Sequence, residues 1–176
     1  MQITLDMLKE WGACSSGIEH FTKSFPDGIG EYQDVLNKAA ELGYIGDASW
    51  LLSKAGRTDA VLEIDGEYSG KHLVFAGRIF IKNSLSVEGW LIAGEGIEAG
   101  LGIKAGDGIK AGEGIKAGEG IKAGWGIKAG LGIEAGEDFG IFAGLRIKLS
   151  RWSISAVVTA KSKPENLVSG HWKETE

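Results

Sequence analysis

A six-residue unit repeats with little variation between Leu91 and Leu149. Written from its alanine, the unit is Ala-Gly-x-Gly-Ile-Lys/Glu, where x varies. Its isoleucines recur at an unbroken spacing of six, at Ile97, Ile103, Ile109, Ile115, Ile121, Ile127 and Ile133. Self-similarity at a fixed short period is the mark of a solenoid, so this repeat constrains the fold more than any other feature of the chain.

The chemistry of the unit favours strands joined by corners. A period of six does not match an α-helix, and two glycines in each unit disfavour a helix further. In Gly-Ile-Lys-Ala-Gly the side chains alternate, so Ile and Ala share an inner face and Lys or Glu lies outside. We expect the following Gly-x-Gly to turn a corner through glycines with positive φ. The pattern predicts a triangular, single-stranded β-helix with three units in each coil, and it leaves the hand of the coil open.

Residues 1–56 predict a small helical head. We expect four helices: one from a Thr4 cap to Trp11, one from a Ser15 or Ser16 cap to Phe25, one from about Gly30 to Leu42, and one from an Asp47 cap over Ala48–Lys54. Helices this short are not stable alone in water, so they must pack on one another or on an end of the solenoid. The expected fold class is therefore α+β, a helical head or cap followed by a β-solenoid.

The repeat loses its regularity on both sides. From Asp59 the period changes to two, so residues 59–90 are expected to form the first, irregular coils. Ile141 follows Ile133 at eight rather than six, which predicts a bulging loop near Asp138, and Ile147 restores the step. Further strands are expected over Trp152–Lys161 and Asn166–Trp172. The predicted domains are the head at 1–56, the β-helix at 57–161 with regular repeats at 91–149, and a C-terminal strand or tail at 162–176.

The repeat resembles two known solenoid families. Like the hexapeptide-repeat left-handed β-helix family, it has one aliphatic residue per six, although that family places a small residue two before it and this chain has Glu95 two before Ile97. The Gly-Ile-x-Ala core also resembles bactofilins, which form polymers through a right-handed β-helix. The whole chain, with its head and repeats such as AGEGIKAGWGIKAG, looks like small uncharacterised phage and prophage proteins.

Composition narrows the classes of partner. The net charge is −5, and lysines and glutamates alternate in the repeats, so we expect no nucleic-acid partner. The longest apolar runs are far shorter than a membrane span, which argues against a membrane partner. The N-terminus has no signal-peptide pattern, and the single cysteine, Cys14, fits a reducing compartment. The expected location is the cytoplasm of a bacterial host.

The sequence shows no constellation that predicts catalysis, a metal or a cofactor. His20, His72 and His171 all lie outside the regular array, with no acid at a telling spacing. Cys14 has no recognisable partner motif, and there is no Cys/His cluster with zinc spacing. We therefore expect no catalytic residues, no metal and no cofactor. If the resemblance to hexapeptide-repeat acyltransferases held for function, His72 would be the base.

The variable position x indicates a binding surface. It is acidic in most units, so it should face solvent, and the apolar residues found there should be exposed. We predict that Leu101, Trp125 and Leu131 are exposed, and that Trp125 and Leu131 anchor a partner beside the Asp138 loop.

The preferred functional hypothesis is a non-enzymatic binding protein of the phage or prophage type. It would dock on a host protein as a stoichiometric inhibitor, for example of a defence system, as an anti-CRISPR protein does. The alternative is a structural, self-assembling protein, like bactofilins or a part of a virion, and a homodimer is compatible with either. A hexapeptide-repeat acyltransferase is the third hypothesis.

Overall fold

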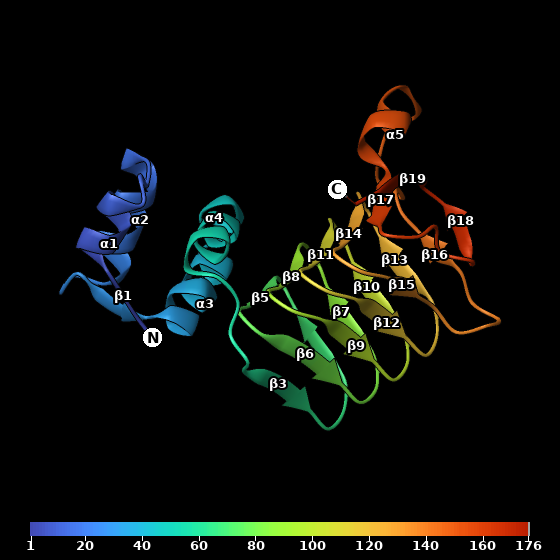
Figure 1. Cartoon of the computed structure of the whole chain (residues 1–176), viewed down its shortest axis with the longest axis horizontal. Coiled ribbons are helices and arrows are strands. Elements are labelled where there is room, and N and C mark those ends of the chain that lie inside the picture. Colours follow the sequence, from blue (N-terminus) through green and yellow to red (C-terminus); the bar gives the residue numbers. More distant parts are fainter. Residues whose placement is uncertain (176) are drawn as a thin grey trace. The chain divides into compact units, whose positions relative to one another are not determined.

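The computed structural model describes residues 1–175, which form two compact units with their boundary between Gly56 and Arg57. The first unit is mainly helical and the second is a parallel β-solenoid of about six turns (Figure 1). The predicted α+β fold class is confirmed.

The helical unit contains a small sheet that the sequence did not predict. Its elements are β1 (Gln2–Thr4), α1 (Leu5–Glu10), α2 (Ser15–Ser24), β2 (Ile29–Glu31), α3 (Tyr32–Leu42) and α4 (Ile45–Ala55). β1 and β2 pair antiparallel, with Ile3 opposite Gly30. The third helix therefore begins at Tyr32 and not near Gly30, because the residues before it are used in strand pairing.

The helix caps differ in part from the prediction. Thr4 caps α1 as expected, since its hydroxyl accepts a hydrogen bond from the Met7 amide at 3.2 Å. The predicted caps at Ser15 or Ser16 and at Asp47 were wrong. Cys14 occupies the N-cap of α2, and the side chain of Asp47 lies in the first turn of α4. Its carboxylate binds His20 instead, at 2.7 Å.

Tyr32 ties the start of α3 to the end of the helical unit. Its side chain is buried, and its hydroxyl donates a hydrogen bond to the Gly56 carbonyl at 2.8 Å. Burial raises the pKa of Tyr32 to about 12. An unfolded tyrosine ionises near pH 10, so the fold favours the neutral phenol.

We therefore expect the helical unit to lose stability as the pH rises from about 10 to about 12. Below about pH 10 the contribution of Tyr32 is complete, because the phenol is neutral in both folded and unfolded chains. Tyrosinate absorbance followed during alkaline titration should show a late-ionising group that is absent in Tyr32→Phe. An unchanged titration curve in the variant would contradict the assignment.

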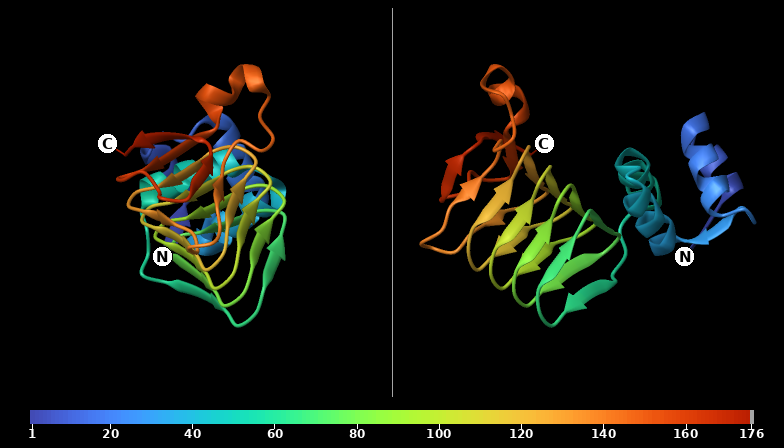
Figure 2. Two further views of the ribbon diagram at one scale, coloured as in Figure 1. Left: turned by 90° about the vertical axis from the view of Figure 1, so that its right-hand side faces the viewer. Right: turned by 180° about the vertical axis from the view of Figure 1, so that it is seen from behind.

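The solenoid consists of three parallel sheets, one for each side of the triangle (Figure 2). The first sheet contains β3 (Val61–Ile64), β6 (Arg78–Ile81), β9 (Ile97–Ala99), β12 (Ile115–Ala117) and β15 (Ile133–Glu134). The second contains β4 (Tyr68–Gly70), β7 (Leu85–Val87), β10 (Ile103–Ala105), β13 (Ile121–Ala123), β16 (Ile141–Phe142) and β18 (Leu167–Ser169). The third contains β5 (Leu73–Phe75), β8 (Leu91–Ala93), β11 (Ile109–Ala111), β14 (Ile127–Ala129), β17 (Val157–Ala160) and β19 (His171–Glu174).

The strand register confirms three units in each coil. Ile103 pairs with Ile121, its third successor in the repeat, and Ala105 likewise pairs with Ala123. The isoleucines and alanines of the regular strands are buried, from 0% to 4% exposed, and they form one continuous core cluster. Identical side chains thus stack on one another inside the coils, while Lys and Glu of the same strands face outward.

The corner glycines have a different role from the predicted one. Within residues 1–175, positive φ occurs only at Gly12, Gly28, Gly43, Gly56, Gly144 and Gly170, and none of these lies in a Gly-x-Gly-Ile unit. The first glycine of each Gly-x-Gly instead lies directly against a carbonyl oxygen of the preceding coil. A Cβ on Gly112, for example, would overlap the carbonyl oxygen of Gly94. Glycine is required there because the backbones approach closely.

The regular array ends in one short insertion and one longer one. Ile141 pairs with Ile121, so the coil gains residues at the exposed turn around Asp138, as predicted. The prediction that Ile147 restores the strand pattern was wrong. Ile147 lies in a bend ahead of helix α5 (Leu149–Ser155). No Gly-x-Gly-Ile unit occurs there, and Gly144, at φ 81°, turns the chain outward. The predicted strand from Trp152 is helical at first, and β17 begins at Val157.

Candidate functional site

The sequence-predicted anchors lie on three different corners of the solenoid. Because a coil holds three units, every third variable position falls in one column. Hydrogen bonds join Leu131 to Glu113, Glu119 to Leu101, and Trp125 to Asp107, each between a backbone amide and a carbonyl of the preceding coil. Leu101, Trp125 and Leu131 are 41%, 46% and 44% exposed, so their predicted exposure is confirmed. The structure does not bring them together in one patch.

Asp138 belongs to the corner of Leu101. It is exposed in the inserted turn, and the preceding Gly136 donates its amide to the Glu119 carbonyl in that column. Strand β14 separates Trp125 from Leu131. Neighbours along the chain are therefore one full side of the triangle apart, roughly six residues at about 3.3 Å each. Trp125 and Leu131 are close in the sequence, and the prediction that they form one surface did not account for the corner between them.

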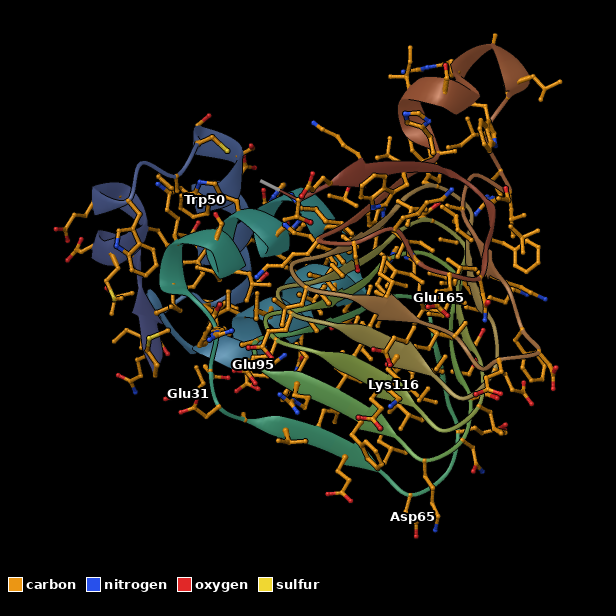
Figure 3. The ribbon with its side chains drawn as sticks, turned by 45° about the vertical axis from the view of Figure 1, so that its right-hand side comes forward. Glu31, Trp50, Asp65, Glu95, Lys116 and Glu165 are labelled. Carbon is orange, nitrogen blue, oxygen red and sulfur yellow. The ribbon has the colours of Figure 1, made fainter. Side chains whose placement is uncertain are left out.

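The corner of Leu131 is occupied mainly by ion pairs. Arg57 and Arg78 each bind both Glu95 and Glu113, and the shortest contact is 2.6 Å, from Arg57 Nη1 to Glu113 Oε1. The Glu95 side chain, labelled in Figure 3, is only 15% exposed. The variable position was predicted to face solvent, but at this corner the two arginines bind and neutralise Glu95 and Glu113. This corner offers little unbalanced charge to a partner.

The corner of Trp125 borders a groove on the outer side of the third sheet. The groove has a volume of about 340 Å³, and its principal side chains are Trp90, Trp125, Lys110, Lys128, Ser155 and Thr159. Burial lowers the pKa of Lys110, and the neighbouring Lys128 lowers it further. Of the residues that the structure describes, no Asp or Glu lines the groove. This surface, which we call the tryptophan groove, combines aromatic area with positive charge.

Sequence reasoning missed Trp90 and Lys110. Trp90 lies one coil before Gly108, and its ring covers the space that a Cβ at Gly108 would need. The sequence did contain a sign of this arrangement, because Trp90 occupies the position that Gly108 occupies one coil later. A large ring at that position lies over the small residue. Lys110 looked like one more outward lysine, and only the fold shows that it pairs with Lys128 in the next coil and lines a groove with two tryptophans.

The helical unit contains a pocket of its own. Its volume is about 300 Å³, and its walls are mostly apolar, formed by residues such as Leu8, Phe21, Phe25, Trp50 and Leu51. The bound pair of His20 and Asp47 lies at its side, and the His20 ring stacks on Tyr44 with ring centroids 3.6 Å apart. The Cys14 thiol contacts the Ser16 hydroxyl at 3.2 Å, and this hydrogen bond lowers the pKa of Cys14.

The histidines outside the helical unit lie in different surroundings. His72, the base of the acyltransferase hypothesis, accepts a hydrogen bond at Nδ1 from the Trp90 amide at 3.0 Å. His171 is exposed on β19. Among residues 1–175, no group of three or more His, Cys, Asp or Glu side chains could hold a metal ion. Nor does any helix in that range have the length and apolarity to cross a membrane.

Residues 1–58 match the family model of the YdhT N-terminal domain. The matched segment corresponds to the helical unit and ends two residues after its boundary at Gly56. No curated protein and no solved structure matches the chain. The similarity thus covers the helical unit and does not extend into the coils of the solenoid.

Proposed function

We propose that this chain is a non-enzymatic β-solenoid binding protein of the phage or prophage type. It docks through the tryptophan groove on an acidic surface of a host protein, in the bacterial cytoplasm, and acts as a stoichiometric inhibitor. The phage setting is supported by the resemblance of the repeats and by the YdhT-like helical unit. One observation carries the docking site: Trp125 is 46% exposed beside Trp90 and two lysines.

The physical argument rests on rigidity and side-chain type. Both tryptophans stand on closely hydrogen-bonded coils, so the surface is preformed and loses little conformational entropy on binding. Tryptophan is enriched among the residues that dominate binding energy, and it buries a large area when a partner covers it. Lys110 and Lys128 supply positive charge, which favours an acidic partner and speeds association.

Three hydrogen bonds support the proposal that the chain is not an enzyme. His72 uses Nδ1 to accept the Trp90 amide, which fixes its ring as part of a corner. The thiol of Cys14 has Ser16 as its hydrogen-bond partner, and His20 is held by Asp47. Covalent catalysis requires a nucleophile that is hydrogen-bonded to a base, and the hydrogen-bond partner of the Cys14 thiol is the Ser16 hydroxyl.

Trp125→Ala should weaken capture of the host protein by roughly thirtyfold, corresponding to about 2 kcal/mol for an interface anchor. Its melting temperature should stay close to that of the original chain, because the side chain is half exposed and outside the core. Leu101→Ala, on another corner, is the matched control and should leave capture unchanged. Pull-down from host lysate with quantitative mass spectrometry measures capture by both variants, and the pull-down is then repeated with the isolated partner. A Trp125→Ala chain that unfolds, or that captures the partner normally, would refute the docking site.

Self-assembly is the second candidate function, and the open edges favour it. β18 and β19 end the second and third sheets, and each pairs with only one neighbour within the described chain. Unpaired strand edges can pair with another copy, giving a homodimer or a filament. Extended filaments in electron micrographs of the purified protein would support this function over docking.

A further inference from the structure

Helix α5 and the loop before it project from the solenoid. The segment from Gly144 to Ser155 leaves the corner of Trp125, where the Gly144 amide donates to the Trp125 carbonyl at 2.7 Å. Arg146 ties its base to the coils by donating to the Gly106 carbonyl at 3.0 Å. Figures 1 and 2 show α5 standing away from all three sheets of the solenoid. We call residues 144–155 the projection.

The projection exposes large apolar side chains to an unusual degree. Leu149 is 92% exposed, Ile154 73% and Leu145 56%. No residue of α5 is buried. Trp152, by contrast, packs back toward Gly144, where an added Cβ would meet its ring nitrogen at 2.8 Å. The base is thus held by Trp152 and Arg146, and Leu145 also lies there, because its amide donates to the Ala123 carbonyl at 3.3 Å. Leu149 and Ile154 of α5 are exposed apolar groups that the fold does not use. Such clusters mark interaction sites.

The charge of this region is opposite to that of the chain. The projection has no acidic residue and three basic ones, Arg146, Lys148 and Arg151. Arg146 pairs with Asp107 of the coils at 3.5 Å, so Lys148 and Arg151 are the cations that give the projection its positive charge. The whole chain carries a net charge of −5. Exposed apolar side chains interleaved with Lys and Arg match the boundary between anionic headgroups and acyl chains.

The directions of the apolar side chains favour a fluid partner over a protein groove. Leu149 and Ile154 are five positions apart, so on a helix with about 100° per residue they point roughly 140° from each other. A protein groove accepts one helix face, whereas lipid surrounds an inserted tip from every side. The long side chains of Lys148 and Arg151 can extend back to the headgroups while the tip inserts.

We propose that the projection inserts its tip into the surface of an anionic lipid bilayer and attaches the protein peripherally. This replaces the expectation of no membrane partner, which considered only segments long enough to span. The proposal rests on the exposure and charge of the projection, of which only Ser155 also lines the tryptophan groove.

Co-sedimentation of the full-length chain with vesicles tests the proposal. Vesicles of phosphatidylcholine with about one-third phosphatidylglycerol should bind the chain at least tenfold more tightly than pure phosphatidylcholine, and added salt should weaken the binding. The double variant Leu149→Ser, Ile154→Ser should lose roughly tenfold or more. Reversing Lys148 and Arg151 to glutamate should cost at least roughly twentyfold, since each nearby cation contributes about fivefold.

Matched controls separate specific insertion from general charge and folding effects. Leu101→Ser removes an exposed leucine at another corner, and Lys104→Glu with Lys122→Glu makes the same change in net charge on the second sheet. Both controls should bind like the original chain, and circular dichroism should show every variant folded. Absence of binding to anionic vesicles would overturn the proposal in favour of a protein partner for the projection. Equal losses in the control and projection variants would overturn it as well.

Discussion

Gly112→Ala is expected to destabilise the solenoid by at least about 3 kcal/mol. An alanine Cβ at this position would overlap the carbonyl oxygen of Gly94 in the preceding coil. Relief requires the two coils to move apart, and the Gly112 amide now donates to the Ala93 carbonyl at 3.2 Å, so the movement also weakens the ladder. Overpacking normally costs about 1–3 kcal/mol, and a clash between two backbones has no flexible side chain to absorb it.

Gly132→Ala provides the matched control for this substitution. Gly132 also belongs to a corner Gly-x-Gly, but no atom lies within 4 Å of an added Cβ, and its φ is not positive. We expect a stability within about 1 kcal/mol of the original, with a slight gain from the lower entropy of the unfolded chain. Urea unfolding followed by circular dichroism measures both variants. Equal effects at Gly112 and Gly132 would show that close approach is not why the repeat keeps its first glycine.

The solenoid was predictable because its physics is local and repeated. Alternation within Ile-Lys-Ala fixes which face is buried, and a constant step of six fixes the register between coils. Every unit has the same alternation of apolar and charged side chains, so the position of each strand can be predicted from its own unit. The insertion at Asp138 was predictable for the same reason, because a change of step in a regular array stands out.

The features that the sequence did not predict depend on non-local contacts. Whether Gly112 is needed for positive φ or for space depends on a carbonyl in another coil. Asp47 resembled a helix cap, but His20, 27 residues earlier, binds its carboxylate. The candidate site also depends on non-local contacts. The sequence predicted that Trp125 is exposed, but only the stacking of the coils places Trp90 in the same groove. Helix α5 interrupts the array where repeat reasoning expected another strand.

Ile115→Ala should lower the free energy of unfolding of the solenoid by about 3 kcal/mol. Ile115 is 1% exposed, and it pairs with Ile97 on one side and Ile133 on the other, so its side chain fills a continuous column. Truncation leaves a cavity that hydrogen-bonded coils on both sides cannot close, and buried Ile→Ala changes typically cost about 2–5 kcal/mol. Urea unfolding again supplies the measurement.

Lys116→Ala, one residue further along the same strand, should change stability by less than about 0.5 kcal/mol. The Lys116 side chain is 64% exposed, and its ion pair with Glu134, at 3.8 Å, is of the surface kind that contributes little. Ile115 faces the core and Lys116 faces solvent, so we expect a large loss of stability from the first substitution and almost none from the second. If Lys116→Ala proved as costly as Ile115→Ala, the strand would not present one face to a packed core, and the stacking of isoleucines could not be what holds the coils together.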